Sequence, residues 1–220
     1  MAIKKGDFIE VDYIGKLLDS NEIFDLTKEE DAKKNKVHNP RAKYGSKKVC
    51  VGEGQLVNGL DEAFIGKDLD KIYNIELTPE KAFGKKDAKL MKIVPTNIFT
   101  KQNIRPMPGL QVNIDNSIGT IKTVSGGRTI VDFNHPLAGR DVKYEFKITK
   151  IIKDDKEKIE TLINPITNML NITPEIEVKE GNAKIKTHMK DLFEKTFKEK
   201  ITKLIPSVKK VAFEEISAKV

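Results

Sequence analysis

Residues 11–25 read VDYIGKLLDSNEIFD, two β-type segments joined by a polar turn. Apolar and polar residues alternate from position 7 to position 17, which predicts a half-buried strand. The second segment ends on Phe24 and Asp25, so a carboxylate follows an aromatic ring. That carboxylate either caps a turn or stands at the wall of an apolar pocket. The buried face of the predicted strand carries Ile9, Val11, Tyr13 and Leu17, and the outer face carries Glu10, Asp12 and Lys16.

The composition is that of a globular chain with a substantial core. Charged residues make up 33% of the 220 residues and hydrophobic residues 38%. No apolar run approaches about 18 residues, and the first residues lack the apolar segment of a signal peptide. We therefore expect a soluble cytoplasmic protein with no membrane partner.

Metal and cofactor chemistry have little support in the sequence. Cys50 is the only cysteine, and His38, His135 and His188 lie far apart, without the spacing of ligands on one helix. The sequence contains no phosphate-binding glycine loop and no nucleophile elbow. We therefore expect no metal, no cofactor and no covalent catalysis.

The net charge of +7 raises the question of a nucleic-acid partner. Only four of the 40 basic residues are arginines, whereas bidentate recognition of phosphates and bases favours arginine. The lysines are interspersed with acidic residues, as in FEKTFKEKITK, which is typical of a solvated surface. We expect no nucleic-acid partner; a ribosome-associated or nucleic-acid-binding module would instead show a steep salt dependence of binding.

The chain starts a sheet, interrupts it and then completes it. Residues 26–45 are polar and predict a long surface excursion with one or two helical turns. The segment GEGQLVNGLDEAFIG predicts a short helix, and KIYNIEL predicts a strand with Tyr73, Ile75 and Leu77 inward. A small β-rich unit follows, and VKYEFKI then resumes the two-residue period of the first strand. The helix would place its apolar side on the sheet through Leu56, Val57, Leu60, Phe64 and Ile65.

Three parts result from this pattern. Residues 1–87 and 133–153 form one discontinuous domain, residues 88–132 form an all-β unit, and residues 154–220 form an α+β domain. In the last part, Pro165 must kink or break its helix, and a hairpin turns around Gly181-Asn182. An apolar stripe on the final helix predicts either a homodimer or packing within the chain, and the sequence leaves both open. The stripe consists of Phe193, Phe197, Ile201 and Leu204.

Five motifs occur in a recognisable order: VDYIGKL, IFD, VGEGQLVNGLDEAFIG, LTPEKAFG and NHPLAGRDVKYEFKI. Over about residues 3–152 they resemble the FKBP-type peptidyl-prolyl cis-trans isomerases. The unit at 88–132 resembles the insert-in-flap domain of the SlyD-like branch, and residues 154–220 weakly resemble the extension of long archaeal members. The resemblance implies an α+β fold: an antiparallel sheet wrapped on a short helix, an all-β insert and a small C-terminal α+β domain.

The resemblance also implies a rotamase that accelerates rotation about Xaa-Pro bonds during protein folding. Its partners would be unfolded or partly folded proteins and proline-containing peptides. Leu60 departs from the family's common tryptophan, Phe83 from tyrosine and Tyr144 from phenylalanine. By the family's pattern the catalytic residues would be Tyr13, Asp25, Phe83 and Tyr144, and the substrate-binding residues Phe24, Leu56, Val57, Leu60, Leu137 and Ala138.

Alternatives remain for both parts of this function. Taken singly, Tyr13, Phe83 and Tyr144 would be ordinary core aromatics. The apolar residues of the insert either form its own core or give a methionine-rich surface that captures unfolded chains. A non-catalytic holdase on the same scaffold is therefore the alternative to an isomerase with chaperone activity. The insert residues concerned are Leu90, Met91, Ile93, Ile98, Phe99, Met107, Leu110 and Val112.

Overall fold

A computed structural model describes residues 2–216 of the chain. The chain divides into two compact units, one formed by the residues up to Leu77 together with those from Val142 onward, and the other by Thr78–Asp141. Within residues 2–216, no helix is both long enough and apolar enough to cross a membrane.

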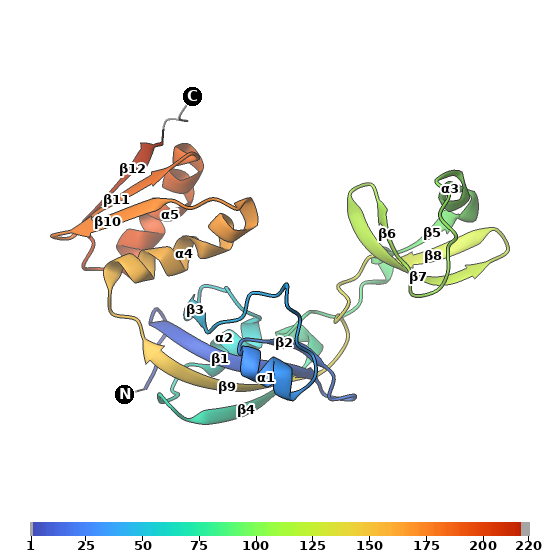
Figure 1. The fold of residues 1–220 in the computed structure, drawn as a ribbon, viewed down its shortest axis with the longest axis horizontal. Helices are drawn as coiled ribbons and strands as arrows, with labels where there is room; N and C mark the ends of the chain where they lie inside the picture. The colour runs from blue at the N-terminus through green and yellow to red at the C-terminus, as the bar shows by residue number, and fades with distance from the viewer. Residues whose placement is uncertain (1, 217–220) are drawn as a thin grey trace. The chain divides into compact units, whose positions relative to one another are not determined.

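The first unit contains a five-stranded antiparallel sheet, in which β1, β9 and β4 lie side by side (Figure 1). The order is β2-β1-β9-β4, and β3 also pairs with β1. The predicted fold class, an antiparallel sheet with a short helix, is confirmed. The elements are β1 (Phe8–Leu17), β2 (Ile23–Leu26), α1 (Glu29–Lys34), β3 (Lys47–Cys50), α2 (Asn58–Ala63), β4 (Ile72–Leu77) and β9 (Val142–Ile151).

The register between β1 and β9 aligns the two predicted apolar faces. Tyr13 lies opposite Phe146 and Gly15 lies opposite Tyr144. Because side chains alternate along a strand, these four residues face the same side of the sheet. The ring of Phe64, the residue that follows α2, packs edge-on against Phe146 with centroids 5.1 Å apart. The core of this domain therefore lies between α2 and the inner face of the sheet.

The outer face of β1 departs from the prediction at Asp12, which is 7% exposed rather than solvated. Its Oδ1 accepts hydrogen bonds from Thr27 Oγ1 at 3.3 Å and Ser46 Oγ at 2.7 Å, and its Oδ2 pairs with Lys28 Nζ at 3.0 Å. The polar segment after β2 thus returns over β1 and covers this carboxylate. The segment contains one short helix, α1, as predicted.

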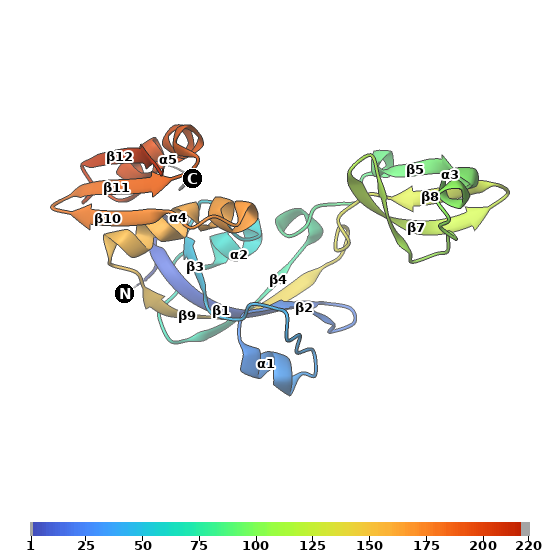
Figure 2. The ribbon, with the colours of Figure 1, turned by 45° about the horizontal axis from the view of Figure 1, so that its top comes forward.

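The C-terminal part of the first unit has two helices that contact each other and a three-stranded sheet (Figure 2). The sheet order is β10-β11-β12, with β10 and β11 antiparallel and β11 and β12 parallel. Their shared core also takes in Phe8 and Cys50 from the first sheet and Ile152, which follows β9. The elements are α4 (Asp155–Leu170), β10 (Glu175–Lys179), β11 (Asn182–Thr187), α5 (Lys190–Leu204) and β12 (Lys210–Glu215).

Two predictions for this region are decided by the structure. Pro165 was predicted to kink or break its helix; α4 runs continuously through it, so of these two alternatives the break is wrong. The side chains of Phe193, Phe197 and Ile201 are buried in the chain's own core, and Leu204 packs against that core. The stripe therefore packs within the chain, and of its two predicted roles this is the one that the structure shows.

The second unit is built on a four-stranded antiparallel sheet in the order β5-β8-β7-β6. Its small core contains Val94, Phe99, Val112, Ile121 and Val131. One helix, α3 (Thr96–Lys101), adds to the predicted strands, and Phe99 anchors it in the core. The strands are β5 (Met91–Pro95), β6 (Gln111–Ile114), β7 (Ser117–Ser125) and β8 (Arg128–Asp132).

Candidate active site

Three aromatic rings meet on the inner face of the sheet, each from a different strand. Tyr144 of β9 lies between the other two, with its ring centroid 5.8 Å from that of Tyr13 and 5.7 Å from that of Phe24. The interplanar angles of 73° and 87° are those of edge-to-face contacts, which aromatic rings favour. Tyr13 and Tyr144 are buried, whereas Phe24 is half-buried. The cluster is therefore an apolar wall with one side toward solvent.

Asp25 anchors one ring of the cluster through a hydrogen bond. The Tyr13 hydroxyl donates to Asp25 Oδ2 at 2.8 Å, and the carboxylate itself is exposed. The register of β2 on β1 places Asp25 opposite Gly15, close to the rings. A charged acceptor outside the apolar wall thus fixes the orientation of the buried ring of Tyr13.

Both tyrosines stay protonated at neutral pH. Burial, and then the negative charge of Asp25, raise the pKa of Tyr13 well above its ordinary value. The same two causes, in the same order, raise the pKa of Tyr144. Because an ionised phenol is disfavoured beside Asp25 in this buried setting, neither ring suits a proton-transfer role near neutral pH. The cluster offers shape, apolar surface and fixed dipoles instead.

The residues predicted from the helix region occupy two environments. Leu56 and Val57 are half-buried and directly precede α2, whereas Leu60 within α2 is buried. The preceding loop is held by the buried carboxylate of Asp61 in α2. Its Oδ1 accepts from Gly52 N at 2.9 Å and its Oδ2 from Gly54 N at 3.1 Å.

Comparisons with known proteins identify the family. The model of the FKBP-type peptidyl-prolyl cis-trans isomerases matches residues 1–100, and the model described as FKBP26, IF domain, matches residues 92–137. The chain is 32% identical over 155 residues to the short-type peptidyl-prolyl cis-trans isomerase of Methanocaldococcus jannaschii, covering 70% of this chain and 98% of that protein. The chain belongs to the FKBP-type peptidyl-prolyl cis-trans isomerases.

The SlyD proteins of this family are more distant relatives. The chain is 30% identical over 114 residues to SlyD of Helicobacter pylori, which is 50% of this chain and 60% of that protein. It is 25% identical over 112 residues to SlyD of Escherichia coli, which is 49% of this chain and 57% of that protein. The predicted family, its SlyD-like character and its isomerase class are thereby confirmed.

Gly15 is a residue of this isomerase that sequence reasoning missed. A Cβ atom at this position would lie 2.8 Å from Phe24 Cζ and 2.8 Å from Tyr144 Cε1, closer than real Cβ contacts. Gly15 therefore lets two rings of the cluster close over the backbone of β1. The available signal was a glycine inside an alternating strand, which often marks such a close approach.

The other predicted residues of the isomerase belong to the second unit. The half-buried ring of Phe83 stacks on His135, with centroids 4.7 Å apart and an interplanar angle of 4°. Ala138 is buried and Leu137 is half-buried. His135 was considered only as a metal ligand in the sequence, and its stacking partner lies 52 positions away, beyond the reach of any local pattern.

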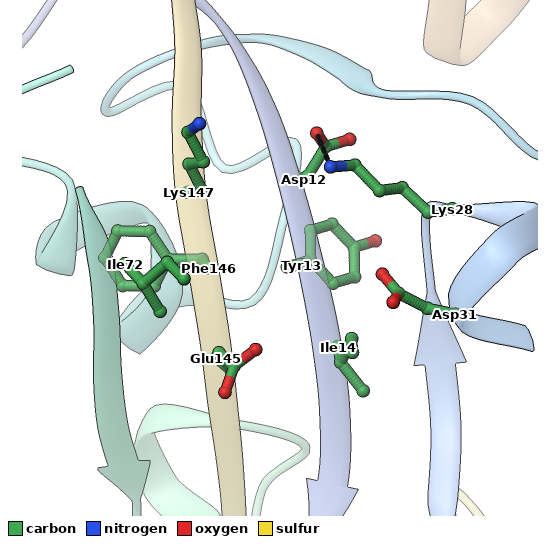
Figure 3. A pocket seen from close by; sticks show the side chains of 9 residues that line it. All are labelled: Asp12, Tyr13, Ile14, Lys28, Asp31, Ile72, Glu145, Phe146 and Lys147. Atoms are coloured by element: carbon green, nitrogen blue, oxygen red, sulfur yellow. Dashed lines mark ion pairs between the residues drawn. The ribbon is translucent and has the colours of Figure 1, made fainter. Parts of the chain in front are cut away.

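A hollow lies beside Tyr13, on the face of β1 opposite to the aromatic cluster (Figure 3). Its volume is about 200 Å³, and its lining includes the ion pair of Asp12 with Lys28. Asp12 and Ile14 alternate with Tyr13 along the strand and so face away from the aromatic cluster. Since most of its lining is charged, this hollow does not suit a proline ring. The residues that line it are Asp12, Tyr13, Ile14, Lys28, Asp31, Ile72, Glu145, Phe146 and Lys147.

Proposed function

We propose that the aromatic cluster is the prolyl pocket of this isomerase. Tyr13, Phe24 and Tyr144 would enclose the proline ring, and Asp25 would hold Tyr13 in place. The observation that carries the proposal is the three-ring cluster whose buried hydroxyl is bonded to a carboxylate at its edge. Such an arrangement combines an apolar surface with one fixed polar contact, as ligand pockets commonly do.

The proposed mechanism needs no bond to the substrate. Rotation about a peptide bond has a barrier of about 18–20 kcal/mol because it destroys the amide resonance. The twisted amide is less dipolar than the planar one, so a dry apolar pocket disfavours the planar ground state relative to the transition state. The Tyr13 hydroxyl and the Asp25 carboxylate would add an electrostatic interaction with the rotating carbonyl.

The remaining predicted residues would complete the pocket. We assign Leu56 and Val57 to a wall that contacts the substrate, and Leu60 to the floor. By the family's pattern, Phe83 would have a catalytic role, and Leu137 and Ala138 would have substrate-binding roles. Support for these roles comes from the family's motif order and from the apolar character of the side chains.

A peptide assay tests the function. We expect the wild-type chain to accelerate cis-trans exchange of an Xaa-Pro tetrapeptide, measured by a coupled protease that cleaves only the trans form. Asp25→Ala should retain a reduced rate, because the rings persist without their anchor. A holdase, the alternative, would show no rate above background in either protein, and that result would contradict the proposal.

We further propose that the second unit captures unfolded chains. Several large apolar residues of this unit are exposed, including Ile93 at 64% and Ile118 at 69%. Such a surface on a small unit with its own buried core suits adaptable binding of varied apolar segments. Of the residues predicted for this role, Leu90, Met91, Ile93, Ile98 and Met107 are exposed, whereas Phe99 and Val112 are buried in the core.

Deleting residues 89–132 should separate capture from catalysis. Asp87 N donates to Asn134 Oδ1 at 2.8 Å, and Asn134 Nδ2 donates to Asp87 O at 3.0 Å, so the two cut ends already lie together. We expect kcat/KM on an unfolded protein substrate to fall about 100-fold, because capture raises the local concentration of prolyl bonds. The rate on a tetrapeptide should change little.

A variant with Ile93→Ser and Ile118→Ser is the matched control for this deletion. Both side chains are exposed, so the fold of the second unit should persist while its apolar surface is weakened. Its protein-substrate rate should fall between those of the wild type and the deletion. Equal losses on peptide and protein substrates would argue against the capture role.

We propose that the substrates are cytoplasmic folding intermediates with prolyl bonds. We also propose that the three predicted parts are the functional domains: residues 1–87 with 133–153, residues 88–132 and residues 154–220. A homodimer through the C-terminal domain stays a proposal. Because the stripe of α5 is buried within the chain, such a dimer would need a different surface. Light scattering of the full chain measures its mass in solution and so shows whether it is a dimer.

A further inference from the structure

The side chain of Gln55 bridges the isomerase domain and helix α4. Cys50 N donates to Gln55 Oε1 at 2.7 Å, and Gln55 Nε2 donates to Thr161 O at 2.8 Å. The two bonds fix the amide orientation, because the flipped amide would place its NH2 group against a backbone N–H. Gln55 directly precedes Leu56 and Val57 in the chain.

Pro165 explains why Thr161 accepts a bond from outside its helix. In an α-helix the N–H of residue i+4 donates to the carbonyl of residue i, so residue 165 would serve Thr161. Proline has no N–H, and α4 continues through it. Gln55 supplies the donor that the helix lacks at this buried residue. The proline thus leaves an acceptor in the helix that a side chain from another element satisfies.

The loop around Gln55 is held from two directions. Asp61 binds the N–H groups of Gly52 and Gly54 from the side of α2. Gln55 binds α4, and Glu53 forms an ion pair with Lys200 of α5 at 3.1 Å. Of the two links to the C-terminal helices, the exposed ion pair is screened by solvent and holds the loop weakly. The Gln55 bonds are the stronger tether.

We propose that Gln55 is a positioning residue of the isomerase, through which α4 holds the loop that presents Leu56 and Val57 to the prolyl ring. This role rests on the proposed function of those two residues in the pocket. The bond to Thr161 limits how far the loop can move away from α4. The C-terminal region then contributes to catalysis on every substrate, including short peptides.

Three variants separate positioning from stability. Gln55→Ala should lower kcat/KM on a tetrapeptide about 10-fold, since small displacements of positioning groups have large effects on rate. It should also lower Tm, because the Thr161 carbonyl loses its donor. Pro165→Ala restores an N–H at position 165, which can satisfy that carbonyl within the helix. The double variant should therefore recover part of the lost Tm, because Cys50 N still lacks the acceptor that Gln55 supplied, while its kcat/KM stays low.

Glu157→Gln is the matched control at the same domain contact. It removes the ion pairs of Glu157 with Lys48 of β3 at 2.8 Å and Lys150 of β9 at 3.2 Å, which join α4 to the sheet without touching Gln55. Its tetrapeptide kcat/KM should equal that of the wild type. A comparable loss in Glu157→Gln would show that any loosening of α4 suffices and would overturn the role of Gln55.

The remaining outcomes show whether the positioning role of Gln55 fails alone or together with the proposed function. If the wild type is active and Gln55→Ala matches it, the positioning role falls and the isomerase function stands. The same conclusion follows if activity returns together with Tm in the double variant, since Gln55 would then act only on stability. If the wild type itself shows no tetrapeptide activity, the proposed function falls, and the positioning role falls with it.

Discussion

Tyr144→Ala is expected to reduce kcat/KM on an Xaa-Pro tetrapeptide about 100-fold, which corresponds to about 2.7 kcal/mol of transition-state stabilisation. Tyr144 is the central ring of the cluster and contacts both Tyr13 and Phe24 edge-on. Removing it leaves the other two rings without a shared neighbour and admits water to the site of the proline ring. Because the proposed mechanism depends on a dry apolar surface, the loss of the central ring should exceed the effect of any polar change.

The same substitution should also lower the free energy of unfolding by about 3–5 kcal/mol, as large-to-small changes of buried aromatics do. Tyr144 is only 3% exposed, so a cavity would form. Urea denaturation followed by circular dichroism measures this loss. It also shows whether the activity assay was performed on folded protein.

Two further substitutions at this position keep the prediction testable if Tyr144→Ala folds poorly. Tyr144→Leu retains much of the apolar volume but not the ring, so we expect a folded protein with most of the activity lost. Tyr144→Phe retains the ring contacts and removes only the hydroxyl, so its activity should stay close to that of the wild type. Wild-type activity in Tyr144→Leu would show that the aromatic edge contacts are unnecessary.

Sequence patterns predicted which face of each strand is buried, but not which residues of other strands that face contacts. The two-residue period of β1 and β9 placed Tyr13 and Tyr144 inward, because burial of alternate residues is a local property of a strand. The pattern could not predict that Phe24 and Tyr13 would both contact Tyr144. That contact depends on the registers of β2 and β9 on β1, which are set by tertiary packing. The family resemblance supplied what periodicity lacked.

Asp12 and Pro165 show why two local rules gave wrong predictions. Asp12 falls on the polar face by periodicity, yet Thr27 and Ser46 from the following segment cover it and satisfy its carboxylate. Pro165 was expected to kink or break its helix, yet the helix is continuous, and Gln55, 110 positions away, donates to the carbonyl that the proline leaves without a helical partner. In both cases a polar side chain from another part of the chain satisfies a buried polar group that the local sequence leaves without a partner.

The stripe of α5 illustrates a related limit. The periodicity of Phe193, Phe197 and Ile201 identified an apolar face that had to be covered. It could not distinguish a second copy of the chain from the chain's own core, because both offer apolar surface. The structure has the stripe in the core that also contains Phe8 and Ile152, residues more than 40 positions away in sequence.

Gly15→Ala is the second substitution for which we expect a large effect, although it adds only one methyl group. The new Cβ would lie 2.8 Å from atoms of both Phe24 and Tyr144, so the two rings must move apart. Overpacking of this kind destabilises by about 1–3 kcal/mol. A total stability of about 5–15 kcal/mol is usual, so the variant should remain folded at 25 °C.

The activity of Gly15→Ala should fall more than its stability suggests. Displacing two walls of the pocket by a few tenths of an ångström or more changes the fit of the proline ring, and a misplacement of about 1 Å can cost about 100-fold in rate. We therefore expect kcat/KM on a tetrapeptide to fall about 10- to 100-fold. Ring-current shifts of Phe24 and Tyr144 in NMR spectra would report the displacement directly.

Gly119→Ala is the matched control, because it creates the same kind of overpacking in the second unit. Its Cβ would lie 2.5 Å from Val131 Cγ1 and 2.9 Å from Phe133 Cδ1. This variant should be destabilised to a similar extent yet keep its tetrapeptide activity, since the strain lies in the insert and not among the rings. If Gly15→Ala displaced Phe24 and Tyr144 without loss of activity, the position of these rings would not govern catalysis. The three rings would then be ordinary residues of the hydrophobic core, which is the role expected of each ring taken singly.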